Sequence, residues 1–570
     1  MQAFKSHLGV LTAALLMSGS AFAHDKSHHV AMKTELRQFG DLPHAAPSNP
    51  DEADVPLWGN LGTLSYAIAT SKPLAQRYFD QGLMLAYGFN HAEARRSFQA
   101  AQRIDPDCAM CFWGEALVLG PNINAPMEDA AREPALAALG QARKLAGRAS
   151  EREQALIEAL AARYSADPSA ERAALDQAYA AAMERVAARF PADLDIAVLY
   201  AEALMNLSPW DYWEAGGTKP KGRTADIVAT LERVLAAHPD HPGAIHYYIH
   251  AVEASDRPQR AEPYADRLAK QKLGAGHLVH MPSHIYYRIG RYKDSLETNK
   301  AAVAADEAFF ARVKAEGIYR GGYYPHNIHF LLASAQMAGD GETAVQAAGK
   351  LEKAVSDEIV RTVPWTQPIK AAPYFAHAQF SSPETVLALA APTDEFPYVK
   401  AMWHYARGVA QAAAGNTAAA QAEAKAIAGL AEADFGSLVA GGVPAPDVLR
   451  LARHIVLARI AQAKGDLQAA IREFEAAAAI QATLAFFEPP FWYYPVRQSL
   501  GAVRLQAGEP EKAEQDFRAS LKGTPNNGWA LYGLMQVYEA RRETGKAEEV
   551  ARRLQKAWAG DRRLLDLKRL

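Results

Sequence analysis

Cysteine is scarce in this sequence, long apolar runs are nearly absent, and neither sign of charge dominates. Two cysteines among 570 residues exclude a disulfide-dense scaffold. The 61 Lys and Arg residues nearly balance the 64 Asp and Glu residues, and no long basic block occurs, so we expect no nucleic-acid partner. Beyond residue 23 no apolar run approaches the roughly 20 residues of a membrane span.

The common catalytic motifs are also missing. The sequence has no His-Glu-x-x-His, no Gly-x-Ser-x-Gly elbow, no P-loop and no dinucleotide fingerprint. We therefore name no catalytic and no cofactor-binding residue from the sequence. What the chain does have is ample material for a core, with 49% hydrophobic and 22% charged residues.

The first segment predicts an exported protein. Residues 1–23 carry Lys5, an apolar run from Leu8 to Met17 and the small-x-small triplet Ala21-Phe22-Ala23. This pattern is typical of a bacterial signal peptide cleaved after Ala23, which predicts a periplasmic or secreted location. Residues 24–73 read as an extended N-terminal lead-in. Its first residues include His24, His28 and His29, which are able to bind copper or zinc, although a polar tail is the preferred interpretation.

From about residue 74 the chain predicts amphipathic helices, because apolar residues recur three and four positions apart. A longer period is also visible. Gly82, Ala94, Phe98 and Pro106 are separated by 12, 4 and 8 residues, and the same spacing recurs in the set Gly501, Ala513, Phe517 and Pro525. Small residues at such points let two helices approach closely, the aromatic ring fills the gap between hairpins, and the proline ends the second helix.

This pattern resembles the tetratricopeptide repeat (TPR) family, whose unit is a helical hairpin of about 34 residues. The resemblance implies an all-α solenoid of TPR-like hairpins with a right-handed superhelical concave groove. Prolines divide the array in the sequence. We expect an N-terminal array at residues 74–360, a Pro-rich connection at 361–398 and a C-terminal array at 399–570.

Paired histidines recur at the period of the repeat. His246 and His280 are 34 residues apart, and so are His250 and His284. The next unit, after an insertion at about residues 308–322, brings further histidines, and Glu253 follows the first pair. In TPR units the second, fifth, ninth and twelfth places of the first helix face the groove, and counting from neighbouring units puts these side chains there. The predicted set is His246, His250, Glu253, His280, His284, His326 and His329.

This set predicts either a metal site or a plain polar groove. Residues three or four apart on a helix have Cβ atoms about 5–6 Å apart, which suits two ligands of one ion. Imidazole with carboxylate favours a transition metal such as zinc, copper or iron. The alternative is a metal-free scaffold whose histidines and neighbouring tyrosines hydrogen-bond a peptide or protein partner. A metal-dependent enzyme, with Glu253 as base, is a third reading that no motif supports.

The two cysteines lie close together in the motif Cys108-Ala-Met-Cys111. A helix N-terminus lowers the pKa of a thiol, which would permit redox exchange. No histidine follows Cys111, so attachment of a c-type haem is excluded. For an exported protein a local disulfide is the favoured interpretation.

Overall fold

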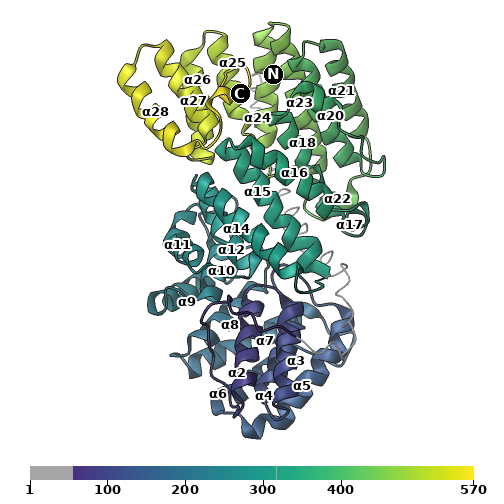
Figure 1. Cartoon of the computed structure of the whole chain (residues 1–570), viewed down its shortest axis with the longest axis vertical. Coiled ribbons are helices and arrows are strands. Elements are labelled where there is room, and N and C mark those ends of the chain that lie inside the picture. Colours follow the sequence, from purple (N-terminus) through teal and green to yellow (C-terminus); the bar gives the residue numbers. More distant parts are fainter. Residues whose placement is uncertain (1–54, 316) are drawn as a thin grey trace, which may run out of the picture.

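The computed structural model describes residues 55–315 and 317–570. The predicted signal peptide and the histidines of the N-terminal tail lie outside these residues. The described part is built from helices, with two isolated β-bridges and no strand. Figure 1 shows the helices stacked side by side, with the first helices at one end of the long axis and the C-terminal half at the other. No helix in this part of the chain is long and apolar enough to cross a bilayer.

The first nine helical elements of the stack precede the histidine region. Their ends follow ordinary capping chemistry: for example, Ser150 and Glu153 form a reciprocal capping box at the start of α6. The bounds are α2 (Pro73–Tyr87), α3 (His91–Ile104), α4 (Ala109–Val118), η1 (Asp129–Ala131), α5 (Arg132–Leu145), η2 (Ala146–Arg148), α6 (Glu151–Ala161), α7 (Arg172–Arg189) and α8 (Leu194–Met205).

The middle of the chain carries the predicted site. Prolines begin several of these helices, where a missing N–H costs nothing. The bounds are α9 (Thr224–Ala237), α10 (Pro242–Val252), η3 (Pro258–Ala261), α11 (Glu262–Lys270), α12 (Gly276–His280), α13 (Pro282–Arg288), α14 (Tyr292–Phe310), the π-helical turn η4 (Tyr319–Tyr323), α15 (Tyr324–Ala338) and α16 (Gly341–Ala354).

The remaining helices complete the array. They are α17 (Asp357–Thr362), η5 (Pro364–Thr366), α18 (Gln367–Phe380), α19 (Pro383–Leu387), α20 (Pro397–Ala413), α21 (Thr417–Leu430), α22 (Gly436–Ala440), α23 (Ala445–Ala463), α24 (Leu467–Gln481), α25 (Val496–Gln506), α26 (Pro510–Gly523), α27 (Gly528–Ala540), α28 (Thr544–Ala557) and η6 (Arg562–Leu564). The all-α solenoid of helical hairpins predicted from the sequence is the observed fold.

The repeat positions pack as the spacing predicts. The buried ring of Phe98 lies against Gly82 of α2 and Gly114 of α4, so closely that a Cβ on either glycine would lie within 3 Å of the ring. Phe517 repeats this arrangement between Gly501 and Gly533. The small residues therefore let three consecutive helices close around one aromatic side chain.

Substitutions at two glycines, one packed against Phe98 and one in open space, test this packing. We expect Gly114→Ala to destabilise the fold by about 1–3 kcal/mol, because its Cβ would lie 2.4 Å from the Phe98 ring and overpack the core. Gly140, in α5, has no atom within 4 Å of an added Cβ, so Gly140→Ala should raise stability by about 0.5–1 kcal/mol. Thermal unfolding followed by circular dichroism measures both. Equal effects of the two substitutions would contradict this account.

The predicted connection at 361–398 does not interrupt the stack. Helix α18 occupies much of it, contains Pro373, and packs against α16 on one side and α20 on the other. Prolines 364 and 368 fall in the first turns of η5 and α18, where proline is tolerated, so a proline-rich sequence forms helix here. Stacking therefore continues from the first array into the second.

The C-terminal array folds back onto the middle of the chain. The Trp529 indole of α27 donates to the carbonyl of Gln336 in α15 at 3.1 Å. The Ala559 amide donates to the carbonyl of Ala338, at the end of the same helix, at 2.9 Å. The loop at 482–495, between α24 and α25, reaches α13 and α15 through Glu488 and Tyr493. Residues about 200 positions apart therefore meet at the histidine region.

Candidate functional site

Six histidines from four helices gather in the middle of the solenoid. His246 and His250 lie one turn apart on α10, which begins at Pro242 with His241 as its cap. Helices α12, α13 and α15 supply the others. By ligand-atom distances they divide into a first histidine trio and a second histidine trio, within each of which the possible ligand atoms lie within 4.8 Å of one another. The first comprises His246, His250 and His277, and the second comprises His280, His284 and His326.

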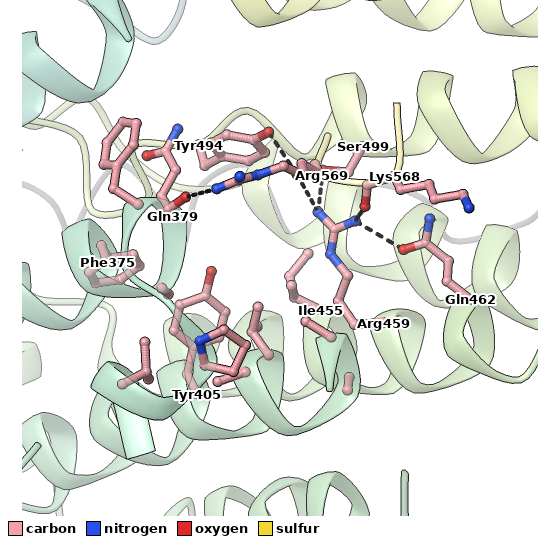
Figure 2. Close-up of a pocket in the computed structure, with 18 of the residues that line it drawn as sticks. Phe375, Gln379, Tyr405, Ile455, Arg459, Gln462, Tyr494, Ser499, Lys568 and Arg569 are labelled. Atoms are coloured by element: carbon pink, nitrogen blue, oxygen red, sulfur yellow. Dashed lines mark hydrogen bonds between the residues drawn. The ribbon is translucent and has the colours of Figure 1, made fainter. Parts of the chain in front are cut away.

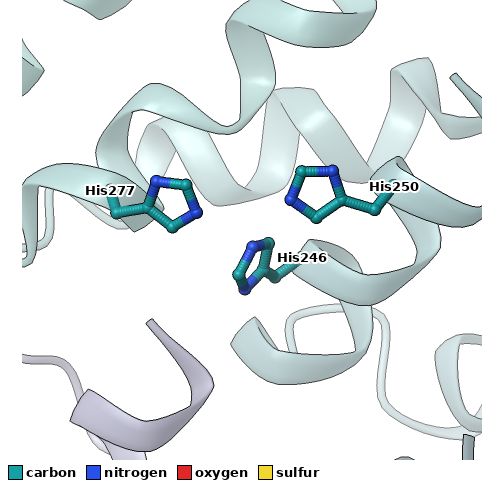
Figure 3. Close-up of side chains that lie close together, drawn as sticks. All are labelled: His246, His250 and His277. Carbon is teal, nitrogen blue, oxygen red and sulfur yellow. The ribbon is translucent and has the colours of Figure 1, made fainter. Parts of the chain in front are cut away.

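The first histidine trio is fully enclosed by protein. Its three side chains are between 0 and 2% exposed, and Figure 3 shows them directed at one another from two segments. The ring centroid of His246 lies 4.9 Å from that of His250 and 5.0 Å from that of His277. The three rings therefore face a common point.

Hydrogen bonds fix which nitrogen atoms of this trio face that point. The Nδ1–H of His246 donates to the Tyr87 carbonyl at 2.5 Å, and the Nδ1–H of His250 donates to Glu253 Oε1 at 2.7 Å. The Nε2 atoms of His246 and His250 and both ring nitrogens of His277 are buried without a partner. A buried polar atom left unpaired costs about 1–3 kcal/mol, so four such nitrogens in one place mark a candidate ligand site.

Burial keeps these imidazoles neutral. Desolvation lowers the pKa of His250 to about 3, with the charged His284 nearby adding to the effect. The pKa values of His246 and His277 also fall well below the ordinary range, first because of burial and then because of neighbouring histidines. A neutral imidazole whose Nδ1–H is held by a carbonyl or a carboxylate presents Nε2 as a metal ligand.

The second histidine trio contains a close nitrogen pair. The Nε2 atoms of His280 and His284 are 2.7 Å apart. The Nδ1–H of His280 donates to Asn299 Oδ1 at 2.6 Å, and Asn299 is oriented by its own donation to the Ser295 carbonyl at 2.8 Å. The half-buried His326 completes the trio, with its ring centroid 4.8 Å from that of His280.

Two carboxylates lie beside the histidines. Glu253 Oε2 accepts from His284 Nδ1 at 2.8 Å, and Glu488 Oε2 lies 2.5 Å from the same nitrogen. Although burial opposes the charged form, the Glu488 and Glu253 carboxylates outweigh it and raise the pKa of His284 to about 10. Burial, helped by the nearby Glu253, raises the pKa of Glu488 to about 7. In the ion-free protein His284 is thus protonated and donates from Nε2 to His280.

Aromatic residues close the site. Phe89 packs against each ring of the first trio, with centroid distances of 4.5 Å to His246, 6.3 Å to His250 and 5.7 Å to His277. Trp210, from the insertion after α8, covers His250 at 4.9 Å. Both Phe89 and Trp210 have positive φ angles, 55° and 63°, a costly conformation for bulky residues that clusters at functional sites.

The second trio has its own phenyl ring. Phe330 of α15 lies 4.8 Å from His280, 4.7 Å from His284 and 5.2 Å from His326. The sequence predicts histidines lining the concave groove of the solenoid. The rings do share one interior surface, but aromatic side chains and the 482–495 loop cover most of it, and only His326 among the six rings is half-buried rather than buried.

The predicted set and the observed cluster differ in three residues. His329 lies near but turns away, because its Nε2 pairs with the Tyr493 hydroxyl, and it belongs to neither trio. His277 was missed, although its position three residues before His280 is a helical spacing that would have indicated it. Glu488 was also missed, and no local pattern marks it, since it lies 204 residues from His284. The predicted residues that the structure brings together are His246, His250, Glu253, His280, His284 and His326.

The two cysteines are joined as the sequence favoured. Cys108 and Cys111 form a disulfide with a Cα–Cα distance of 5.4 Å. Both are buried, and the Cys108 sulfur also caps α4 by accepting from the Cys111 amide. The pair is far along the chain from the histidine cluster and is structural in character.

Apart from the histidine cluster, a cavity lies in the C-terminal array, called the hollow below. Its volume is about 840 Å³, and aromatic and cationic side chains from α18, α20 and α23 line it. In Figure 2 the Arg459 guanidinium points to the backbone of the last residues, and its Nη2 donates to the Leu570 oxygen at 2.6 Å. Arg459 thereby holds the C-terminal turn of the chain against the hollow.

Asp306 of α14 is a buried carboxylate that is hydrogen-bonded to α15, one of the histidine helices, and to the turn η4 next to it. Its carboxylate accepts from the Tyr319 hydroxyl at 2.8 Å and from Asn327 Nδ2 at 2.7 Å, which ties α14 to η4 and α15. Burial raises the pKa of Asp306 to about 7, and these hydrogen bonds only partly offset it. The folded protein therefore binds this proton more tightly than the unfolded chain does.

This shift predicts a pH-dependent contribution to stability. A raised carboxyl pKa favours the folded state below about pH 4, and that contribution is lost as pH rises to about 7, on the order of 4 kcal/mol in all. The unfolding free energy of the wild type minus that of Asp306→Asn should therefore fall between pH 4 and pH 8. Urea unfolding at several pH values measures it. A difference that is flat, or that rises with pH, would contradict the assignment.

Comparisons with known proteins add little to this picture. The sequence matches no family model and no curated protein. Solved structures that align over most of the chain include a human IFIT1 dimer with m7Gppp-AAAA, at 13% identity and a TM-score of 0.29, covering 93% of this chain and 94% of that chain. Yeast Tom70 aligns at 11% identity and a TM-score of 0.26, covering 84% and 92%. A Naa15/Naa10 complex bound to HypK-THB aligns at 14% identity and a TM-score of 0.22, covering 85% and 70%. Scores this low carry no argument, and the fold is described from the helices themselves.

Proposed function

We propose that this protein is an exported TPR-like solenoid that binds a transition metal ion through the first histidine trio. One observation carries the proposal: four ring nitrogens of His246, His250 and His277 are buried together without a partner. A cation at their common point would satisfy one nitrogen of each ring. Three neutral imidazoles, two of them held through Nδ1 by other groups, form the donor set of a three-coordinate site.

The chemistry of the site favours a metal over a peptide. The rings are enclosed by Phe89 and Trp210, so an extended chain has no access to them. Neutral imidazole nitrogens suit zinc, copper and iron. The proposed location rests on the signal-peptide pattern of residues 1–23, and a disulfide between Cys108 and Cys111 is in keeping with an oxidising compartment.

Metal analysis of the purified chain tests this function. The protein is prepared without residues 1–29, which removes the histidine tail, and its metal content is measured by mass spectrometry after loading with copper or zinc and gel filtration. We expect the wild-type protein to retain a stoichiometric ion, and the His277→Ala variant to lose the ion of the first trio. His454→Ala is the matched control, because His454 also pairs with a carboxylate, Glu473 at 2.7 Å, but lies in the C-terminal array. A chain that retains no ion with either metal would overturn the proposal.

A second candidate function rests on the hollow in the C-terminal array. Its aromatic lining and the hydrogen bond from Arg459 to a main-chain oxygen of the C-terminal turn favour a scaffold that binds a peptide segment of a partner protein. Binding of a panel of unstructured peptides, measured by fluorescence polarisation, tests it. Binding that is abolished by Arg459→Ala supports this function, and binding that is unaffected by the substitution counts against this hollow.

A further inference from the structure

We infer that the second histidine trio binds a second transition metal ion, so that the two ions form one dinuclear centre. The inference rests on the proposed function for the first trio and adds a site to it. It also names the cofactor class: a pair of first-row transition ions, of which copper fits the charge of the site best.

The close nitrogen pair shows where the second ion would sit. The Nδ1 atoms of His280 and His284 are occupied by Asn299 and by carboxylates, so both Nε2 atoms face each other across 2.7 Å. Two nitrogen lone pairs at that distance require a positive species between them. In the ion-free protein this is a proton. His326 adds a third imidazole to the same point, and an ion that displaces the proton gains three ligands.

The repeat register makes the two trios equivalent. His246 and His250 occupy the same two places of one unit that His280 and His284 occupy in the next, 34 residues later. The third ligand of each trio comes from the following unit. His277 of the first trio lies three residues before His280, and His326 of the second trio lies three residues before His329. The second trio is thus the first trio repeated one unit further along the solenoid.

The packing repeats as well. Phe89 contacts all three rings of the first trio, and Phe330 contacts all three rings of the second. The two trios are also adjacent, because His250 and His284 have ring centroids 5.3 Å apart and His277 and His280 have centroids 5.9 Å apart. Known two-metal sites hold their ions about 3.5–4 Å apart, and neighbouring trios with these ring spacings fit such a pair.

Glu253 links the trios without being a ligand. Its Oε1 accepts from His250 of the first trio at 2.7 Å, and its Oε2 accepts from His284 of the second at 2.8 Å. A competing arrangement would place one ion among His250, Glu253, His284 and Glu488, whose atoms also lie within 4.8 Å of one another. The Nδ1 and carboxylate atoms of that group are already satisfied by mutual hydrogen bonds, whereas the Nε2 atoms of His246 and His250 have no partner. We therefore assign Glu253 as the positioning residue of both halves.

The charge of the site favours a pair of cuprous ions over a pair of divalent ions. The six imidazoles bind as neutral ligands, and among residues 55–315 and 317–570 the carboxylates hydrogen-bonded to them are those of Glu253 and Glu488. Two cuprous ions would be balanced by these two negative charges. Two divalent ions would leave an excess of two positive charges in a buried site, which is costly unless an anion such as hydroxide joins them.

Copper loading tests the second site. The protein comprising residues 30–570 is loaded anaerobically with cuprous ion and gel-filtered, and its copper content is measured. We expect two copper ions per chain in the wild type and one in each of His277→Ala and His326→Ala, with thermal melts showing that the variants fold. After oxidation, two neighbouring cupric ions should couple magnetically, so the integrated electron paramagnetic resonance signal should fall below two spins. Each single-ion variant should give its full one-spin signal.

The outcomes separate the two proposals. One ion in the wild type that is kept by His326→Ala and lost by His277→Ala overturns the second site and leaves the proposed function intact. No ion in the wild type overturns both. Two ions with a full two-spin signal overturn the dinuclear arrangement, because the ions would then be far apart.

Discussion

Replacing His250 and His284 together by alanine should leave the protein without stoichiometric metal. The two side chains belong to different trios, and each variant trio retains only two imidazoles. Protein sites that retain transition ions generally supply at least three ligands, so two are insufficient to hold an ion through gel filtration. The measurement is metal content per chain after loading with excess copper or zinc. The metal content per chain should fall from stoichiometric in the wild type to background in the double variant.

His329→Ala is the matched control for this experiment. His329 is a buried histidine of the same region, but it pairs with Tyr493 and belongs to neither trio. Its removal should leave the metal content unchanged while costing some stability through the lost hydrogen bond, about 1 kcal/mol. Wild-type metal content in the double variant, or loss of metal in His329→Ala, would mean that the ligands have been wrongly identified.

Glu253→Gln should weaken metal binding by about 10–100-fold at the trio whose imidazole loses its acceptor, the usual effect of losing a partner of a metal-bound imidazole. Glutamate presents two acceptor oxygens and receives one Nδ1–H on each. Glutamine keeps one acceptor and places an NH₂ donor where the second stood. One of the two imidazoles then faces a donor, so its ring turns or changes tautomer, and its Nε2 is no longer presented to the ion. Competition titration with a chelator of known affinity gives the change.

Glu473→Gln serves as the control for the carboxylate. It accepts from His454 Nδ1 at 2.7 Å in the same manner, away from the site. Its substitution should not change metal affinity. A Glu253→Gln protein that titrates like the wild type would show that the carboxylate does not orient the rings.

Local periodicity was sufficient to predict the fold and the core of the cluster. The Gly82–Phe98 and Gly501–Phe517 spacings reflect direct contacts between neighbouring helices, and such contacts repeat whenever the hairpin repeats. The histidines at 34-residue intervals share one face for the same reason. These signals survive in a single sequence because each depends only on residues within one or two units.

The rest of the site depends on contacts that no period encodes. Glu488 reaches His284 only because the C-terminal array folds back, and Trp210 covers His250 from an insertion between helices. Insertions and superhelical curvature decide these positions, and neither has a local sequence signature. The same contacts explain why the histidine surface is largely covered, and why His329, at a predicted groove-facing place, instead meets Tyr493 of the returning loop.

The returning loop also bears on how an ion enters and leaves. Glu488 and Tyr493 hold the second half of the molecule against the histidine helices, and Phe89 and Trp210 pack against the first trio. Because all three rings of the first trio are buried, an ion reaches them only when one of these coverings moves aside, so its residence time there would be governed by that local opening as well as by the strength of the bonds. Loading would then be easiest while the nascent chain is still closing, and a cargo acquired at that stage would survive dilution for far longer than its equilibrium constant implies.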